Sequence, residues 1–239
     1  MKNKILFVAV AVVLFFISEV FAEVKPSSLF CESMVLQRGV EIPVWGTAWP
    51  KEKISVMLNK QVVNVTADAS GNWMARLPKQ KAGGPYSLEI AGDNIITYND
   101  VYVGDVWLCS GQSNMDMTVA KEDRYWCGVN NEAEEVANAN YPQIRVFDVD
   151  YAPKNTVQTS VTGKWEVCSP KTVGHFSAVA ITLFFPTIFL KIHMIHLLFL
   201  QISRYLTRMS PLLKIRTITL HSDKTFLKQN HWSYPIIQM

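Results

Sequence analysis

One serine in this chain has neighbours that would allow nucleophilic chemistry. Ser113 lies in the run SGQSNM (residues 110–115), between an apolar stretch and the start of a predicted helix. The first N–H groups of a helix have no intrahelical partner and the helix dipole is positive there, so negative charge on a substrate carbonyl oxygen would be stabilised. A serine beside such donors can attack an ester if a base accepts its proton. The position of Ser113 is therefore suited to ester hydrolysis.

The same serine also has a simpler interpretation. Residues 113–116 (SNMD) resemble a capping box, in which the Ser113 hydroxyl would only close the first helical turn. The segment is not the Gly-x-Ser-x-Gly elbow of α/β-hydrolases, because Met115 stands where the second glycine would be. Spacing alone favours the helix cap, so the chemistry needs further support.

The elements that would position Ser113 form two regions with different patterns. Between residues 24 and 100, short alternating apolar runs are separated by turn residues, which is typical of a small β-sandwich. The expected strands are 34–37, 42–46, 54–58, 62–67, 73–77, 86–90 and 95–98. We therefore expect a β-sandwich domain over residues 23–100.

A longer apolar run changes this pattern at Val101. The expected elements are then a buried strand at 101–109, a helix at 115–120, a helix at 131–139 and a strand at 144–149. Strand, tight loop and helix form the opening unit of an α/β layer. We expect an incomplete α/β domain with a parallel sheet over residues 101–180.

The N-terminal 22 residues have the pattern of a secretory signal peptide. Lys2 and Lys4 precede an apolar run at 5–17, and Ala22 ends a small-residue cleavage pattern. The run is shorter than the roughly 20 residues that span a bilayer. We expect cleavage after Ala22 and a secreted or periplasmic protein.

The four cysteines do not define a metal site. Their number is even in an exported chain, which leaves disulfide pairing open. No histidine stands at ligand spacing from them, so we expect no metal and no other cofactor. The cysteines are Cys31, Cys109, Cys127 and Cys168.

Residues 181–239 differ in composition from everything before them. This tail has no Gly, Ala, Val or Glu and one acidic residue, Asp223, and it carries a net charge of +6 against −3 for residues 1–180. A basic segment alone would suggest nucleic acid or an anionic membrane. However, the depleted residue types all have codons that begin with G, so we interpret the tail as an out-of-frame translation after Ala180. We expect it to be non-native or disordered, with no nucleic-acid partner and no stable membrane span.

A resemblance to a known family strengthens the catalytic interpretation. Residues 104–117 (GDVWLCSGQSNMDM) closely resemble the nucleophile block of the sialate O-acetylesterase family, part of the SGNH hydrolase superfamily. Segments 33–37, 43–46 and 82–86 look like the β-domain of bacterial members, and Trp165 with 176–180 is similar to a later family segment. The likeness covers about residues 24–180 and implies an SGNH, flavodoxin-like α/β domain.

The resemblance also implies an activity and a set of site residues. The reaction would be removal of O-acetyl groups from sialic acid or related glycans, with Ser113 as the nucleophile and its own N–H in the oxyanion hole. Gln112 and Asn114 match the motif and would shape the loop, while Asp116 stands where the family usually has Glu. Gly174 could supply a second oxyanion N–H, or be a loop glycine with no role.

The general base of the family has no counterpart here. The family takes its histidine from an Asp-x-x-His element, and none occurs in this sequence. Asp223, in the tail, has Phe226 at the position where the histidine would stand. His175 has no aspartate at family spacing and is expected to be a surface histidine. Without a base a serine is a weak nucleophile, so we expect a truncated, weakly active or inactive esterase. The alternatives are a non-catalytic carbohydrate-binding or interaction β-module on residues 24–100, or a non-functional gene fragment.

The origin of the tail can be tested in the coding DNA. If the frame slips just after codon 180, translation of a shifted frame beyond that point will continue the esterase-like sequence. Sequencing of the locus checks this. A shifted frame without esterase-like sequence would contradict the frameshift.

Overall fold

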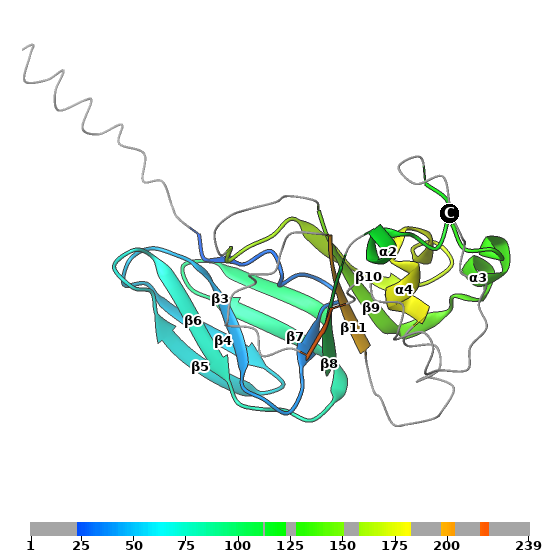
Figure 1. Cartoon of the computed structure of the whole chain (residues 1–239). Helices are drawn as coiled ribbons and strands as arrows, with labels where there is room; N and C mark the ends of the chain where they lie inside the picture. The colour runs from blue at the N-terminus through cyan, green and yellow to red at the C-terminus, as the bar shows by residue number, and fades with distance from the viewer. Residues whose placement is uncertain are drawn as a thin grey trace, which may run out of the picture.

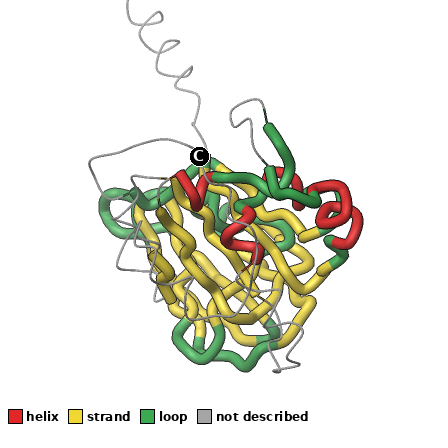
Figure 2. The backbone as a smooth tube through the Cα atoms, turned by 45° about the vertical axis from the view of Figure 1, so that its right-hand side comes forward, coloured by secondary structure: helices red, strands yellow, loops and turns green. Residues whose placement is uncertain are grey.

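The computed structural model describes residues 23–111, 113–122, 128–150, 158–182, 197–203 and 216–219 (Figure 1). The expected signal peptide lies outside these residues. Strands predominate, as the yellow tube in Figure 2 shows. The helices gather at the end of the molecule away from β3–β6 (Figure 1). Of the helices described, none is long and apolar enough to cross a membrane.

The N-terminal region is built from eight strands. They are β1 Lys25–Pro26, β2 Val35–Gln37, β3 Ile42–Thr47, β4 Lys53–Leu58, β5 Gln61–Thr66, β6 Asn72–Leu77, β7 Gly83–Ala91 and β8 Ile95–Gly111. The strand predictions are confirmed to within a few residues, except that the strands expected at 95–98 and 101–109 are one continuous strand, β8. The expected boundary at residue 100 therefore falls inside a strand.

The second region carries the remaining described elements. They are α2 Ser113–Asp116, α3 Glu132–Asn138, β9 Tyr141–Val149, β10 Gly163–Cys168, the 3-10 turn η1 Val173–His175, α4 Ala178–Thr182, β11 Leu197–Ser203 and β12 Arg216–Thr219. One sheet has the order β1-β3-β6, and the larger one has the order β10-β9-β11-β8-β7-β4-β5, with β2 and β12 also paired to β8. The larger sheet thus runs through both regions.

Alternating burial explains why the sandwich strands pair as they do. In β4 and β6 every second side chain is buried, so one face of each strand enters the core and the other remains accessible. β4 pairs antiparallel with β5 and β7, while β6 pairs antiparallel with β3 in the other sheet. The apolar faces of the two sheets meet between them.

Two expectations for the second region differ from the structure. The helix expected at 115–120 ends at Asp116, because Thr118 forms a β-bridge with Ser177 and the Val119 N–H donates to the Phe176 carbonyl at 3.0 Å. The sheet is also not wholly parallel. β11 runs parallel to both β8 and β9, but β10, which the sequence patterns did not reveal, pairs antiparallel with β9.

The core of the sandwich is completed by residues from β9 and β10. Phe147 and Trp165 pack edge to face, with ring centroids 5.5 Å apart, in the same buried cluster as Val44 and Trp45. The Trp165 indole N–H donates to the Leu29 carbonyl at 2.8 Å. Residues 24–100 alone would leave this part of their apolar surface exposed.

The loop before β10 reinforces this contact. The Trp45 indole N–H and the Ser27 hydroxyl both donate to the Thr159 carbonyl at 2.8 Å. The Ser28 hydroxyl also contacts Ser160 at 2.8 Å. The chain therefore returns to the sandwich before β10 begins.

Part of the tail contributes strands to the sheet. β11 lies between β8 and β9, and β12 pairs in parallel with β8. Five residues of β11, LLFLQ, have partners on both sides, so its backbone groups are satisfied as in an internal strand. The expectation that the tail is non-native stays a prediction.

The described cysteines are free thiols. Cys31, Cys109 and Cys168 form no disulfide, and Cys127 lies outside the described residues. Burial raises the pKa of Cys109 and of Cys168 to about 12, so both remain protonated and unreactive near neutral pH.

Replacement of Phe147 by alanine tests whether the two regions share a core. Because the Phe147 side chain is fully buried, we expect Phe147→Ala to lower the free energy of unfolding by about 3–5 kcal/mol. Urea denaturation followed by tryptophan fluorescence measures the change. Ile95→Ala is the control, because Ile95 is 69% exposed. Equal losses in the two variants would contradict a shared core.

Candidate functional site

The candidate nucleophile stands where β8 passes into α2. β8 ends at Gly111 and α2 begins at Ser113, while Gln112 between them lies outside the described residues. For Ser113 and Asn114 the structure describes only the backbone. Ser113 is thus at the carboxyl end of a sheet strand, on the first turn of a helix. This is the strand-to-helix junction that the sequence predicts.

A pair of charged side chains holds β8 to β2 before the junction. Asp105 is 3% exposed and accepts two hydrogen bonds from the Arg38 guanidinium, at 2.9 and 2.8 Å. The Val106 N–H donates to the Gln37 side-chain oxygen at 2.9 Å, and the Arg38 N–H donates to the Gly104 carbonyl at 2.8 Å. Bidentate pairing of this kind fixes orientation as well as distance. The approach of β8 to Ser113 is therefore tightly held.

The helix that begins at Ser113 is short and is held by the segment 174–182. Met115 is 1% exposed and its sulfur accepts a hydrogen bond from the Ser177 hydroxyl at 3.4 Å. The Ala178 N–H donates to the Met117 carbonyl at 2.9 Å, and α4 packs beside α2. Four residues cannot form a stable helix alone, so these contacts keep α2 in place.

Ser177 is a site residue that the sequence analysis did not identify. It is 1% exposed and directly precedes α4, where its hydroxyl oxygen accepts the Ala180 N–H at 3.3 Å. This is the geometry of a helix cap. A serine immediately before the short apolar run 178–181 was the available signal.

Gly174 lies against the segment that follows α2. Its carbonyl accepts the Ala120 N–H at 2.8 Å, and a Cβ on Gly174 would come within 3.2 Å of the Ala120 Cβ. Close approach therefore favours small residues on both sides. The proposed oxyanion contribution of Gly174 stays a prediction.

His175 has a carboxylate partner that sequence spacing did not reveal. Its Nε2 lies 2.6 Å from one oxygen of Glu166, and the Lys164 ammonium lies 2.9 Å from the other. Desolvation raises the pKa of Glu166, but hydrogen bonds from Lys164 and His175 outweigh it, so that pKa is lowered. The His175 side chain is 39% exposed.

A histidine–carboxylate pair is what a nucleophilic serine needs, but this pair lies at the edge of the sheet, away from β8. Glu166 is on β10, the edge strand, and β9 and β11 separate it from β8. Thr118 pairs antiparallel with Ser177, so the chain before Ser177 runs toward Ala120 and away from Ser113. We therefore assign His175 no role as the base.

Comparisons with known proteins find similarity to sialate O-acetylesterases and to a carbohydrate acetylesterase. No family model matches the chain. It is 36% identical over 131 residues to the sialate O-acetylesterase of Mus musculus and 32% identical over 169 residues to that of Homo sapiens. These alignments cover 48% and 62% of this chain, but 23% and 30% of the relatives.

A solved structure extends the likeness to the fold. The crystal structure of a carbohydrate acetylesterase from Xanthomonas citri matches with a TM-score of 0.68 and 33% sequence identity. The match covers 76% of this chain and 40% of that one. The chain therefore spans less than half the length of each of these proteins.

The Glu166 cluster predicts a pH dependence of stability. A carboxyl whose folded pKa is lowered stabilises the fold above its unfolded value, and this contribution is lost as the pH falls through the folded pKa. We expect Glu166→Gln to be less stable than wild type near neutral pH, with the difference shrinking below pH 4.5, the ordinary value for the group. Thermal denaturation across this range measures it, with Lys164→Met to separate the contribution of Lys164. A difference that is constant with pH would contradict the assignment.

Proposed function

Because this chain is related to the sialate O-acetylesterases over the part that aligns with them, we propose that it is a serine esterase acting on O-acetyl groups of sialic acid or related glycans. The observation that carries the proposal is the course of residues 104–117. This stretch, which resembles the nucleophile block of the family, follows β8 and turns into α2 at Ser113. The position of Ser113 between β8 and α2 supports its assignment as the nucleophile.

In the proposed reaction the Ser113 hydroxyl oxygen attacks the acetyl carbonyl carbon. The bond from that carbon to the sugar oxygen breaks, the sugar leaves as an alcohol, and water then releases acetate from the acyl-serine. The unpaired N–H groups of the first turn of α2 are suited to hold the carbonyl oxygen as it becomes negative. Gln112 and Asn114 would shape this loop. Gly174 lies against Ala120, on the segment that runs away from Ser113, so we assign it no donor in this step.

The proposed site has no general base that we can assign. The sequence contains no Asp-x-x-His, and the His175–Glu166 pair is separated from β8 by two strands. A serine without a base retains only the help of the oxyanion donors and of substrate binding. We therefore propose that this chain is weakly active or inactive.

The location and the tail complete the proposal. Residues 1–22 would direct the protein to secretion or the periplasm, where glycans are accessible.

The composition of residues 181–239 supports an out-of-frame tail. The sandwich as an independent carbohydrate-binding module finds no support, because its core includes Phe147 and Trp165.

Replacement of Ser113 tests the proposed nucleophile. We expect the full chain to hydrolyse 4-nitrophenyl acetate slowly. After the uncatalysed rate is subtracted, the rate of Ser113→Ala should be at least about 100-fold lower than that of wild type, because no other group would form the acyl intermediate. Ser70→Ala is the matched control, since Ser70 lies in an exposed turn of the sandwich.

A covalent probe gives a second reading when turnover is low. A fluorophosphonate should label the wild-type chain at Ser113, as located by peptide mass spectrometry, and leave Ser113→Ala unlabelled. Equal hydrolysis by wild type and Ser113→Ala, with no label on Ser113, would refute Ser113 as the nucleophile.

A further inference from the structure

Asp100, midway along β8, and Ser33, in the turn before β2, are in contact, and both have a left-handed backbone conformation. Asp100 has φ +55° and Ser33, in the turn before β2, has φ +62°. Such conformations cost energy for residues with a Cβ and persist where surrounding contacts determine them. The Ser33 hydroxyl donates to Asp100 Oδ2 at 2.9 Å, and the Ser33 N–H donates to the Asn99 carbonyl at 3.3 Å.

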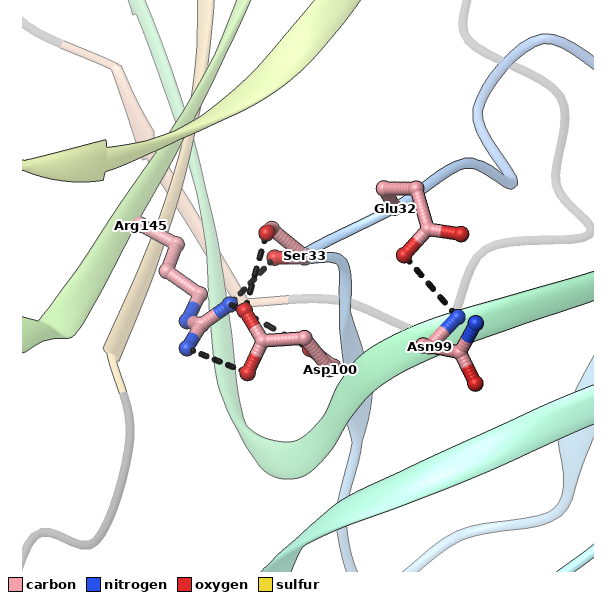
Figure 3. Close-up of polar contacts among 5 residues, drawn as sticks. All are labelled: Glu32, Ser33, Asn99, Asp100 and Arg145. Carbon is pink, nitrogen blue, oxygen red and sulfur yellow. Dashed lines mark hydrogen bonds and ion pairs between the residues drawn. The ribbon is translucent and has the colours of Figure 1, made fainter.

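Arg145 reaches this point from β9. Its Nη1 donates to Asp100 Oδ2 at 2.6 Å, to the Ser33 carbonyl at 3.1 Å and to the Asp100 carbonyl at 3.2 Å, while Nη2 donates to Asp100 Oδ1 at 3.2 Å (Figure 3). The guanidinium carbon lies 4.4 Å from the centre of the Tyr102 ring. We name Arg145, Asp100, Ser33 and Tyr102 the Arg145 joint.

The Arg145 joint is buried on the arginine side and open on the other. The Arg145 side chain is 4% exposed and that of Asp100 is 41% exposed. Beside it the Asn99 N–H donates to Glu32 at 3.0 Å, which ties the same turn to β8 a second time (Figure 3). The joint therefore binds together three segments: the turn before β2, the middle of β8, and β9.

This contact joins two strands that are not neighbours in the sheet. β11 lies between β8 and β9, and Leu198 of β11 is opposite both Arg145 and Val106. The backbone alignment of β8 with β9 thus depends on a strand from the tail. The Arg145 joint links β8 and β9 through side chains, without β11.

We propose that Arg145 is a positioning residue that fixes the bend of β8 at Asp100 and so aligns its second half, which leads to Ser113, with β9. A role in stability alone would be met as well by apolar side chains of similar volume, whereas a planar guanidinium with several acceptors specifies one geometry. An effect of Arg145 on turnover rests on the proposed function, because it requires Ser113 to be the nucleophile. The alignment of β8 with β9 does not depend on that function.

Local hydrogen exchange in the full chain tests the alignment without any need for activity. We expect Arg145→Met to speed amide exchange about tenfold or more in peptides covering 96–106 and 141–149, with little change in the β4–β5 hairpin, because loosening of the joint opens only its own strands. Mass spectrometry of peptic peptides measures this. The matched control is Arg76→Met, since Arg76 is an exposed arginine on β6, and we expect it to change neither region.

Conservative variants keep the test decisive if Arg145→Met does not fold. Asp100→Asn retains one acceptor oxygen and tolerance of a left-handed backbone but loses the charge and the second acceptor. Arg145→Lys retains the charge but loses the planar fork. Both should speed exchange in the same peptides, by less than Arg145→Met. A uniform rise in all peptides, or no change at 96–106, would overturn the positioning role.

Turnover provides the reading that depends on the proposed function. Where the wild-type chain hydrolyses acetyl esters, Arg145→Lys should lower kcat with little change in KM, because it displaces Ser113 without removing a substrate contact. Faster local exchange in a chain whose Ser113 neither supports hydrolysis nor takes the fluorophosphonate label would refute Ser113 as the nucleophile and leave the joint intact. Unchanged exchange in an active chain would refute the joint alone.

Discussion

The structure depends on one strand that belongs to both regions. β8 runs for 17 residues, pairs with β7 of the sandwich along its first half, and carries the second region on its other half. Ladder hydrogen bonds hold β8 on both sides of Asp100, to β7 before it and to β11 after it. The position of Ser113 therefore depends on the sandwich as well as on the second region.

The shared core follows from this continuity. A sandwich of residues 24–100 would be small, and small domains bury too little apolar surface to be very stable alone. Phe147, Val149 and Trp165 add to its core, and the loop at 158–161 adds hydrogen bonds to Ser27, Ser28 and Trp45. The two regions therefore share one buried core.

The proposed site has a candidate nucleophile, Ser113, but no assigned base. The first N–H groups of a helix have no intrahelical partner, so the junction of β8 and α2 would provide the oxyanion donors of the proposed site. Proton transfer needs a side chain from elsewhere in the fold, and the His175–Glu166 pair is placed to stabilise η1 and β10 instead. The alignments cover less than half of each of these relatives.

Local pattern by itself was enough for the sandwich strands, for β9 and α3, and for the junction at Ser113, because alternation of apolar residues and turn chemistry act over a few neighbours. It failed where distant segments compete for the same backbone groups. Residues 117–120 have helical composition, yet they pair with 174–178, and β10 was missed because its burial depends on the sandwich beside it. The Arg145 joint and the His175–Glu166 pair were likewise decided by tertiary structure. An ion pair between residues 45 positions apart leaves no periodic signal, since only the packing of β9 against the bend of β8 brings those charges together.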